Sequence, residues 1–117
     1  MYASGPDYAH SAEVVAPTRW LFVAGTMGLD AGGGAPPTLA EQLELVWANL
    51  REILADAGMT VDHIVRVTSY LRSADYAEEN AAARLVALGG RRVPTTAIVV
   101  GTLSESWLVE LEVVAAA

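Results

Sequence analysis

Several common features are missing from this sequence of 117 residues, and each absence excludes a class of protein. It contains no cysteine, which excludes disulfides and thiolate chemistry. Charged residues make up only 18% and give a net charge of -7, so the chain repels the phosphate backbone of a nucleic acid. The first twenty residues lack the basic start and apolar core of a signal peptide, and no apolar run reaches the roughly 18–20 residues of a membrane span. We therefore expect a cytoplasmic protein that binds neither nucleic acid nor membrane.

Hydrophobic residues, in contrast, make up 53% of the chain. The length suits one domain, residues 1–117, with a core small enough that a partner often completes it. This apolar excess is more than the interior of a small monomer easily hides. Composition therefore favours an oligomer.

Two helices are predicted from their capping signals and periodicity. Residues 38–57 begin with a capping box of Thr38 and Glu41, place apolar residues at helical spacing, and end before Gly58. Residues 75–88 begin with a second expected capping box, Asp75 with Glu78, and end at a glycine pair.

Five strands are predicted from apolar runs and alternation, at residues 8–15, 20–26, 61–71, 93–102 and 107–117. We interpret the last two as a hairpin joined by residues 103–106. The order is then β-β-α-β-α-β-β, an α+β fold with one sheet and both helices on one face. Two helices cover only one face, so a second copy is expected to cover the other.

Glu110 and Glu112 are the most concentrated candidates for chemistry. As i and i+2 on one strand they share a face, roughly 6.5–7 Å apart, within an apolar element. One interpretation has both at a sheet edge, pointing to solvent or an arginine. The other has one of them in an oligomer cleft, acting as a general acid or base. No metal site is expected, because His10 and His63 are far apart and no residues have ligand spacing.

Motifs along nearly the whole chain resemble the RidA (YjgF) family of imine/enamine deaminases. They are Tyr8-Ala9-His10, residues 21–26, Asn49-Leu50, residues 57–59, 62–68 and 75–77 with Asn80, Val93-Pro94, and residues 108–112. The resemblance implies a chorismate-mutase-like fold, a homotrimer with clefts between its subunits, a small-molecule substrate and no cofactor.

The resemblance also assigns site residues. Glu110 matches the glutamate that holds or activates the hydrolytic water, and is the expected catalytic residue. The expected substrate-binding residues are Tyr8, Ala24, Gly25, Thr26, Asn80 and Thr96. Thr96 stands where the deaminases carry an arginine that binds the substrate carboxylate. A hydroxyl supplies neither the positive charge of a guanidinium nor its two parallel N–H donors. The sequence leaves open whether Arg91, Arg92 or His10 reaches the cleft.

The hypothesis is therefore an arginine-less RidA-like hydrolase acting on an imine or enamine that is not a simple 2-imino acid. Two alternatives remain at this point. One is a non-catalytic, small-molecule-binding or chaperone-like trimer. The other is a pathway-specific enzyme that uses the same cleft for cyclisation or dehydration.

Overall fold

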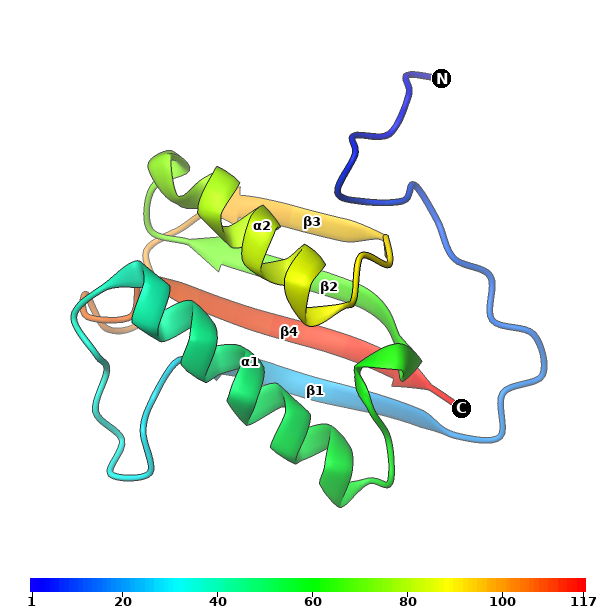
Figure 1. The fold of residues 1–117 in the computed structure, drawn as a ribbon, viewed down its shortest axis with the longest axis horizontal. Helices are drawn as coiled ribbons and strands as arrows, with labels where there is room; N and C mark the ends of the chain where they lie inside the picture. The colour runs from blue at the N-terminus through cyan, green and yellow to red at the C-terminus, as the bar shows by residue number, and fades with distance from the viewer.

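A computed structural model describes all residues, 1–117, as a four-stranded sheet with two helices on one face (Figure 1). The strands are β1 (Trp20–Met27), β2 (Ile64–Leu71), β3 (Thr95–Val99) and β4 (Val109–Ala116), and the helices are α1 (Leu39–Asp56) and α2 (Ala77–Ala87). Short 3-10 turns, Val61–His63 and Ala74–Tyr76, precede β2 and α2. The α+β class and the placement of both helices on one face are confirmed.

The predicted closing hairpin is wrong. The strand order is β1-β4-β2-β3, so β2 separates the two strands that the hairpin would have paired. The crossover through α2 returns the chain to the starting end of β2, and β3 therefore pairs parallel to β2. β4 then runs back between β1 and β2 and pairs antiparallel with both. A central position gives this apolar strand two ladders of hydrogen bonds, where a hairpin at the edge would give one.

The predicted strand at residues 8–15 is also wrong. Only one isolated bridge forms there, between Ala9 and Pro94, and the remainder of residues 1–19 has no helix or strand. A segment with alternating apolar residues forms a strand only where a neighbouring strand can hydrogen-bond to its backbone. Residues 1–19, which we call the N-terminal arm, form this bridge beside the start of β3 and then lead to β1 (Figure 1). Within the arm, His10, Ser11, Ala12 and Val14 line a pocket together with Arg66 of β2 and Val114 of β4.

The N-cap and the end of α1 are confirmed, but its capping box forms only in part, because Glu41 bonds to the Thr38 hydroxyl and not to the Thr38 backbone N–H. The signals for α2 are also confirmed in part. Thr38 accepts a hydrogen bond from the Glu41 backbone N–H at 3.2 Å and donates to its carboxylate at 2.7 Å. Gly58 follows with φ +69°, the left-handed conformation that ends helices. For α2 the end at the glycine pair is correct, but the expected capping box does not form. Ser73 instead accepts from the Asp75 N–H at 3.1 Å and caps the 3-10 turn before the helix.

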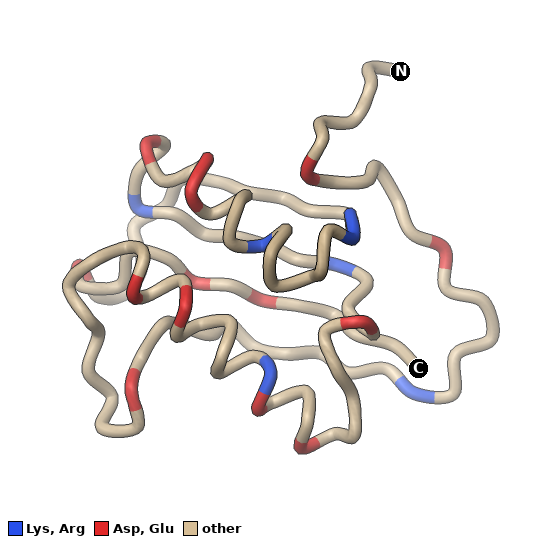
Figure 2. Tube along the Cα trace, viewed as in Figure 1, with Lys and Arg blue, Asp and Glu red and all other residues tan.

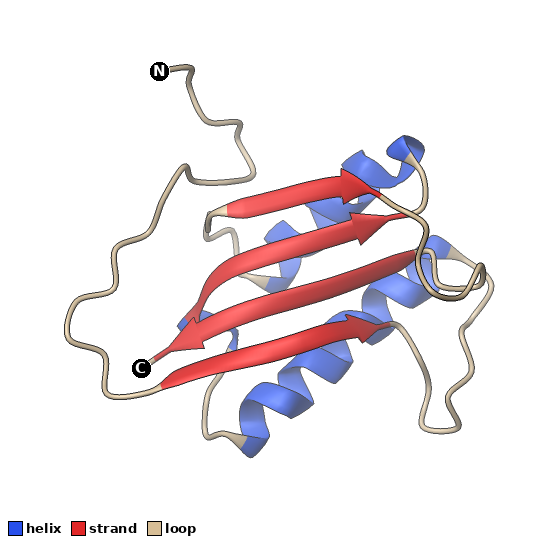
Figure 3. Ribbon diagram, turned by 180° about the vertical axis from the view of Figure 1, so that it is seen from behind, coloured by secondary structure: helices blue, strands red, loops and turns tan.

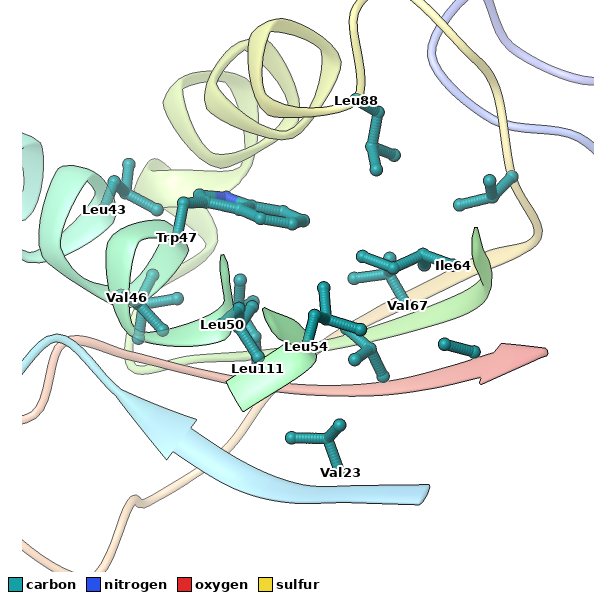
Figure 4. Packing of buried hydrophobic residues seen from close by; sticks show 14 of the residues in the cluster. Val23, Leu43, Val46, Trp47, Leu50, Leu54, Ile64, Val67, Leu88 and Leu111 are labelled. Atoms are coloured by element: carbon teal, nitrogen blue, oxygen red, sulfur yellow. The ribbon is translucent and has the colours of Figure 1, made fainter. Parts of the chain in front are cut away.

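The core lies between the helices and the sheet, and Figure 4 shows Trp47 and the leucines of α1 packed over β2 and β4. Val109, Leu111 and Val113 alternate into this layer and are at most 2% exposed. Each fully buried side chain of this size contributes about 1.5–3 kcal/mol. The side chains between them therefore point to the opposite face.

That opposite face carries no helix, as the view from behind shows (Figure 3). Trp20 and Phe22 of β1 lie on it, 49% and 75% exposed, with their rings stacked 6.3 Å apart. We call it the open face. No helix of the chain is both long and apolar enough to cross a membrane.

Candidate functional site

The open face contains a pocket of about 320 Å³ at the start of β4, which we call the Glu110 pocket. It is lined by two glutamates, a tyrosine, a glycine of β1 and the loop after β3: Glu110, Glu112, Tyr70, Gly25 and residues 100–103. Figure 2 shows the two acidic positions of β4 in the middle of the sheet. The expectation that both carboxylates share one face is confirmed.

Gly25 positions the first of these carboxylates. The register between β1 and β4 shifts between Val23 and Thr26, so Ala24 and Gly25 form a bulge without ladder partners. A methyl group added to Gly25 would lie 2.1 Å from Oε2 of Glu110, which is inside any possible contact distance. Only glycine lets the β1 backbone approach the carboxylate this closely.

Tyr70 distinguishes the two glutamates. It lies beside Glu110 in the β2–β4 register, and its hydroxyl donates a hydrogen bond to the Glu112 carboxylate. This bond raises the pKa of Tyr70, and burial and the charges of Glu112 and Glu110 raise it further against an opposing effect of Arg66. Tyr70 therefore stays a neutral donor at physiological pH. Glu112 is occupied by this bond, whereas the Glu110 carboxylate accepts no hydrogen bond from the chain.

Thr96 lies one strand away from the Glu110 pocket, on β3. Its neighbour in the register is Thr68, and its hydroxyl accepts a hydrogen bond from Nη2 of Arg66 at 3.3 Å. The Arg66 guanidinium of β2 therefore lies beside Thr96 of β3. His10 lines a separate pocket with Arg66 and Trp20, and its Nε2 lies 2.8 Å from the backbone oxygen of Tyr2.

The remaining candidates lie elsewhere. Tyr8 and Asn80 line a pocket between the N-terminal arm, α2 and β3, on the helix side of the sheet. The Thr26 hydroxyl donates to the backbone oxygen of Ala24 at 2.9 Å. Arg91 donates to the backbone oxygens of Val61 and Ile64 at 2.8 and 3.0 Å, so it supports a loop. Within one chain, the structure brings together Gly25 and Glu110 of the expected set and separates them from Tyr8 and Asn80.

Sequence reasoning missed the part played by Tyr70 and Arg66. The alternation along residues 64–71 does place Arg66, Thr68 and Tyr70 on one face. Their partners depend on which strand lies next to β2, and the predicted hairpin put β3 beside β4. Correct pairing of β4 with β2 would have revealed the Tyr70–Glu112 contact.

The structure has a mixed sheet with two helices on one face and an acidic pocket on the other. This is the α+β architecture expected for the class of protein that the sequence resembles. The chain belongs to the Rid/YjgF family, because the family model described as endoribonuclease L-PSP matches residues 3–117. Membership of this family supports a deaminase-like or hydrolase-like role on small molecules at the level of the family.

Individual proteins agree with this membership. A RutC family protein of Pyrococcus abyssi (strain GE5 / Orsay) is 30% identical over 100 residues, which are 83% of this chain and 78% of that protein. The RutC family protein YjgH of Escherichia coli (strain K12) is 42% identical over 50 residues, which are 43% of this chain. The matched segment spans only 38% of YjgH.

Solved structures show the same fold. The Rid family protein YyfB of Yersinia pestis, a protein of unknown function, matches with a TM-score of 0.83 and 27% identity, covering 100% of this chain and 92% of YyfB. A YjgF/YER057c/UK114 family member of Mycobacterium tuberculosis matches with a TM-score of 0.74 and 25% identity, covering 84% of this chain and 79% of that one.

Proposed function

We propose that this chain is a RidA-like hydrolase that adds water to an imine, or to the imine tautomer of an enamine, and releases ammonia. The observation that carries the proposal is the state of Glu110. Its carboxylate faces a pocket, lies against the backbone of Gly25 and accepts no hydrogen bond from the chain. Such a carboxylate is free to accept a proton from a bound water.

The reaction follows from this placement. Glu110 takes one proton from water as the water oxygen bonds to the imine carbon, and passes this proton to the imine nitrogen, giving a neutral carbinolamine. Glu110 then takes the proton of the carbinolamine hydroxyl as the carbonyl forms, and delivers it to the amine nitrogen. The carbon–nitrogen bond breaks in this step, and ammonia leaves. An imine and one water thus give a carbonyl compound and ammonia, with no cofactor.

Hydrogen-bond donors beside the pocket would polarise the substrate. Tyr70 lines the pocket wall, but its hydroxyl proton is already donated to Glu112. Thr96, Thr26 and the backbone at Ala24 and Gly25 remain the candidates that the resemblance assigns to substrate binding.

The charges of the pocket favour a neutral or cationic substrate. Its lining includes Glu110 and Glu112 and no arginine, and two carboxylates repel a third. The position two residues after Pro94 is Thr96, whose hydroxyl is bonded to Arg66 on the neighbouring strand. We therefore propose that the chain belongs to an arginine-less subgroup whose substrate is not a simple 2-imino acid.

The open face suggests how the site is completed. Trp20 and Phe22 are exposed on it, and they form an apolar surface that a second copy would cover. The sheet separates Tyr8 and Asn80 from Glu110 within one chain, so they reach a Glu110 pocket only from a neighbouring subunit. We propose a homotrimer with its sites between subunits.

A matched pair of imines tests the substrate class. An amine oxidase acting on a small primary amine generates a neutral imine, and an amino acid oxidase generates a 2-imino acid of similar size. We expect the protein to accelerate ammonia release from the neutral imine and to leave the decay of the 2-imino acid, including freshly generated 2-aminoacrylate, unchanged. Acceleration of the 2-imino acid alone would overturn the proposed specificity.

RNA cleavage is not the function that we propose, although the family model is described as an endoribonuclease. The chain has a net charge of -7, and its candidate site contains two glutamates. Both repel phosphates. If the neutral-imine assay shows binding without turnover, the protein is a non-catalytic binder; if it shows another product, the cleft serves cyclisation or dehydration.

A further inference from the structure

A second polar pocket, of about 220 Å³, lies on the helix side of the sheet beneath the N-terminal arm. We call it the Arg84 pocket, and its polar lining comes from the arm, α2 and β3: Asp7, Tyr8, Asn80, Arg84 and Thr95. Thr95 pairs with Val67, whose side chain is in the core, so this lining faces the helices and not the open face. None of these residues lines the Glu110 pocket of the same chain.

Arg84 is a buried cation with an incomplete set of partners. It is 3% exposed, and a guanidinium in such a place is costly unless its charge and its N–H groups are paired. Its Nη2 donates to the Asp7 carboxylate at 2.5 Å and to the Asp7 backbone oxygen at 3.2 Å. Its Nε is buried without any partner. Nε and Nη2 lie on the same edge of the guanidinium and can together bind both oxygens of one carboxylate. Asp7 uses only Nη2 of this pair.

Asn80 adds a second unpaired group in the same pocket. It lies one helical turn before Arg84, on the same face of α2, and is 1% exposed. Its Oδ1 is buried and accepts no hydrogen bond. Buried polar atoms are nearly always paired, so two orphaned atoms lining one pocket indicate a missing partner.

We propose that the Arg84 pocket binds a small organic carboxylate that carries an N–H or O–H group on the neighbouring atom. The carboxylate bonds to both Nε and Nη2 of Arg84, and the adjacent donor bonds to Oδ1 of Asn80. In the free protein the side chain of Asp7 occupies the place of the ligand carboxylate with a single bond. Asp7 is thus a built-in competitor that the ligand displaces.

The N-terminal arm can move away from the Arg84 pocket. Residues 1–19 contain no helix or strand, and beyond Asp7 the arm is tied to the start of β3 by the bond from Ala9 N–H to the Val93 oxygen at 3.2 Å. The Asp7 side chain is 28% exposed, whereas Arg84 is buried beneath it. Displacement of Asp7 moves a segment without regular structure and leaves the packed body unchanged.

Thermal unfolding of the full chain tests this site independently of any deaminase activity. We expect Asp7→Ala to lower Tm by on the order of 10 °C, because it leaves a buried guanidinium unpaired. Glycolate, which has a carboxylate and an adjacent hydroxyl, should restore Tm in this variant. The matched control is Glu13→Ala, which removes the same charge from an exposed position of the same arm. It should neither lower Tm nor gain a response to glycolate.

Calorimetric titration assigns the contacts. Glycolate should bind Asp7→Ala at least tenfold more tightly than wild type, acetate should bind that variant more weakly than glycolate, and uncharged glycolamide should not bind it. Arg84→Lys in the Asp7→Ala background keeps the positive charge but removes the paired N–H donors, so its affinity for glycolate should fall tenfold or more. Arg51→Lys, on the surface of α1, should leave the affinity for glycolate unchanged. Equal responses of Asp7→Ala and Glu13→Ala, or no glycolate binding to Asp7→Ala, would overturn the proposal.

Discussion

At the scale of single residues, two glutamates two positions apart on one strand have different surroundings. Glu112 receives the hydroxyl of Tyr70, whereas Glu110 lies against the Gly25 backbone with its carboxylate unbonded. The sequence alone identifies both carboxylates and their common face. It does not distinguish them, because the difference comes from Tyr70, a residue about 40 positions away that only strand pairing brings near.

The raised pKa of Tyr70 predicts a pH effect. The folded state favours the neutral phenol, so the contribution of its hydrogen bond is complete below the ordinary tyrosine pKa of about 10 and is lost as pH rises through the higher folded value. In an absorbance titration of the native protein, Tyr70→Phe should remove the ionisation that has the raised pKa. Tyr2→Phe, at an exposed position, should leave that ionisation in place. The interpretation fails if Glu112→Gln leaves the ionisation of Tyr70 unchanged.

At the scale of elements, local signals predict helices well and strand partners poorly. The capping residue Thr38 and the apolar face of α1 are short-range features, and both are present in the structure. The position of β4 depends on contacts with β1 and β2, which lie far away in the sequence. The pattern in residues 8–15 resembles a strand, but no backbone stands beside it to complete a ladder.

Gln42 of α1 holds the segment before β4 in place by hydrogen bonds. Its buried amide donates to the Pro36 and Ser106 oxygens at 2.8 and 2.7 Å and accepts from the Leu108 N–H at 2.9 Å. Gln42→Leu would leave three backbone groups without this partner, so we expect a loss of about 2–4 kcal/mol in the free energy of unfolding. Urea denaturation measures it, with Glu52→Leu on the exposed side of α1 as the control. Equal stability of the two variants would contradict this role.

At the scale of the whole molecule, one sheet has two different faces. The helices cover the first, and the second presents two exposed aromatic residues of β1 and an acidic pocket. The excess of apolar over charged residues already indicated a second copy, and the exposed pair Trp20 and Phe22 gives that expectation a location. The sequence could not locate it, because the exposed side of β1 follows from its pairing with β4.

The proposed trimer predicts the behaviour of open-face variants. Wild type should have a mass in solution of three times the 12.3 kDa chain. Phe22→Asp places a charge where we propose that copies meet, so light scattering should show monomers. Val86→Asp changes an equally exposed position, 82% against 75%, on the helix side and should leave the trimer intact. A monomeric wild type would contradict the intersubunit site.

The most direct measurement is the rate of ammonia release from a neutral imine by wild type and by Glu110→Gln, with Glu105→Gln as a control in an exposed loop. If Glu110 activates the water, its amide variant should lose about 10²–10⁴-fold in kcat while remaining folded and trimeric, because an amide accepts no proton at neutral pH. Glu105→Gln should match wild type. Equal rates for Glu110→Gln and wild type, in a protein that turns the imine over, would contradict the central role of Glu110.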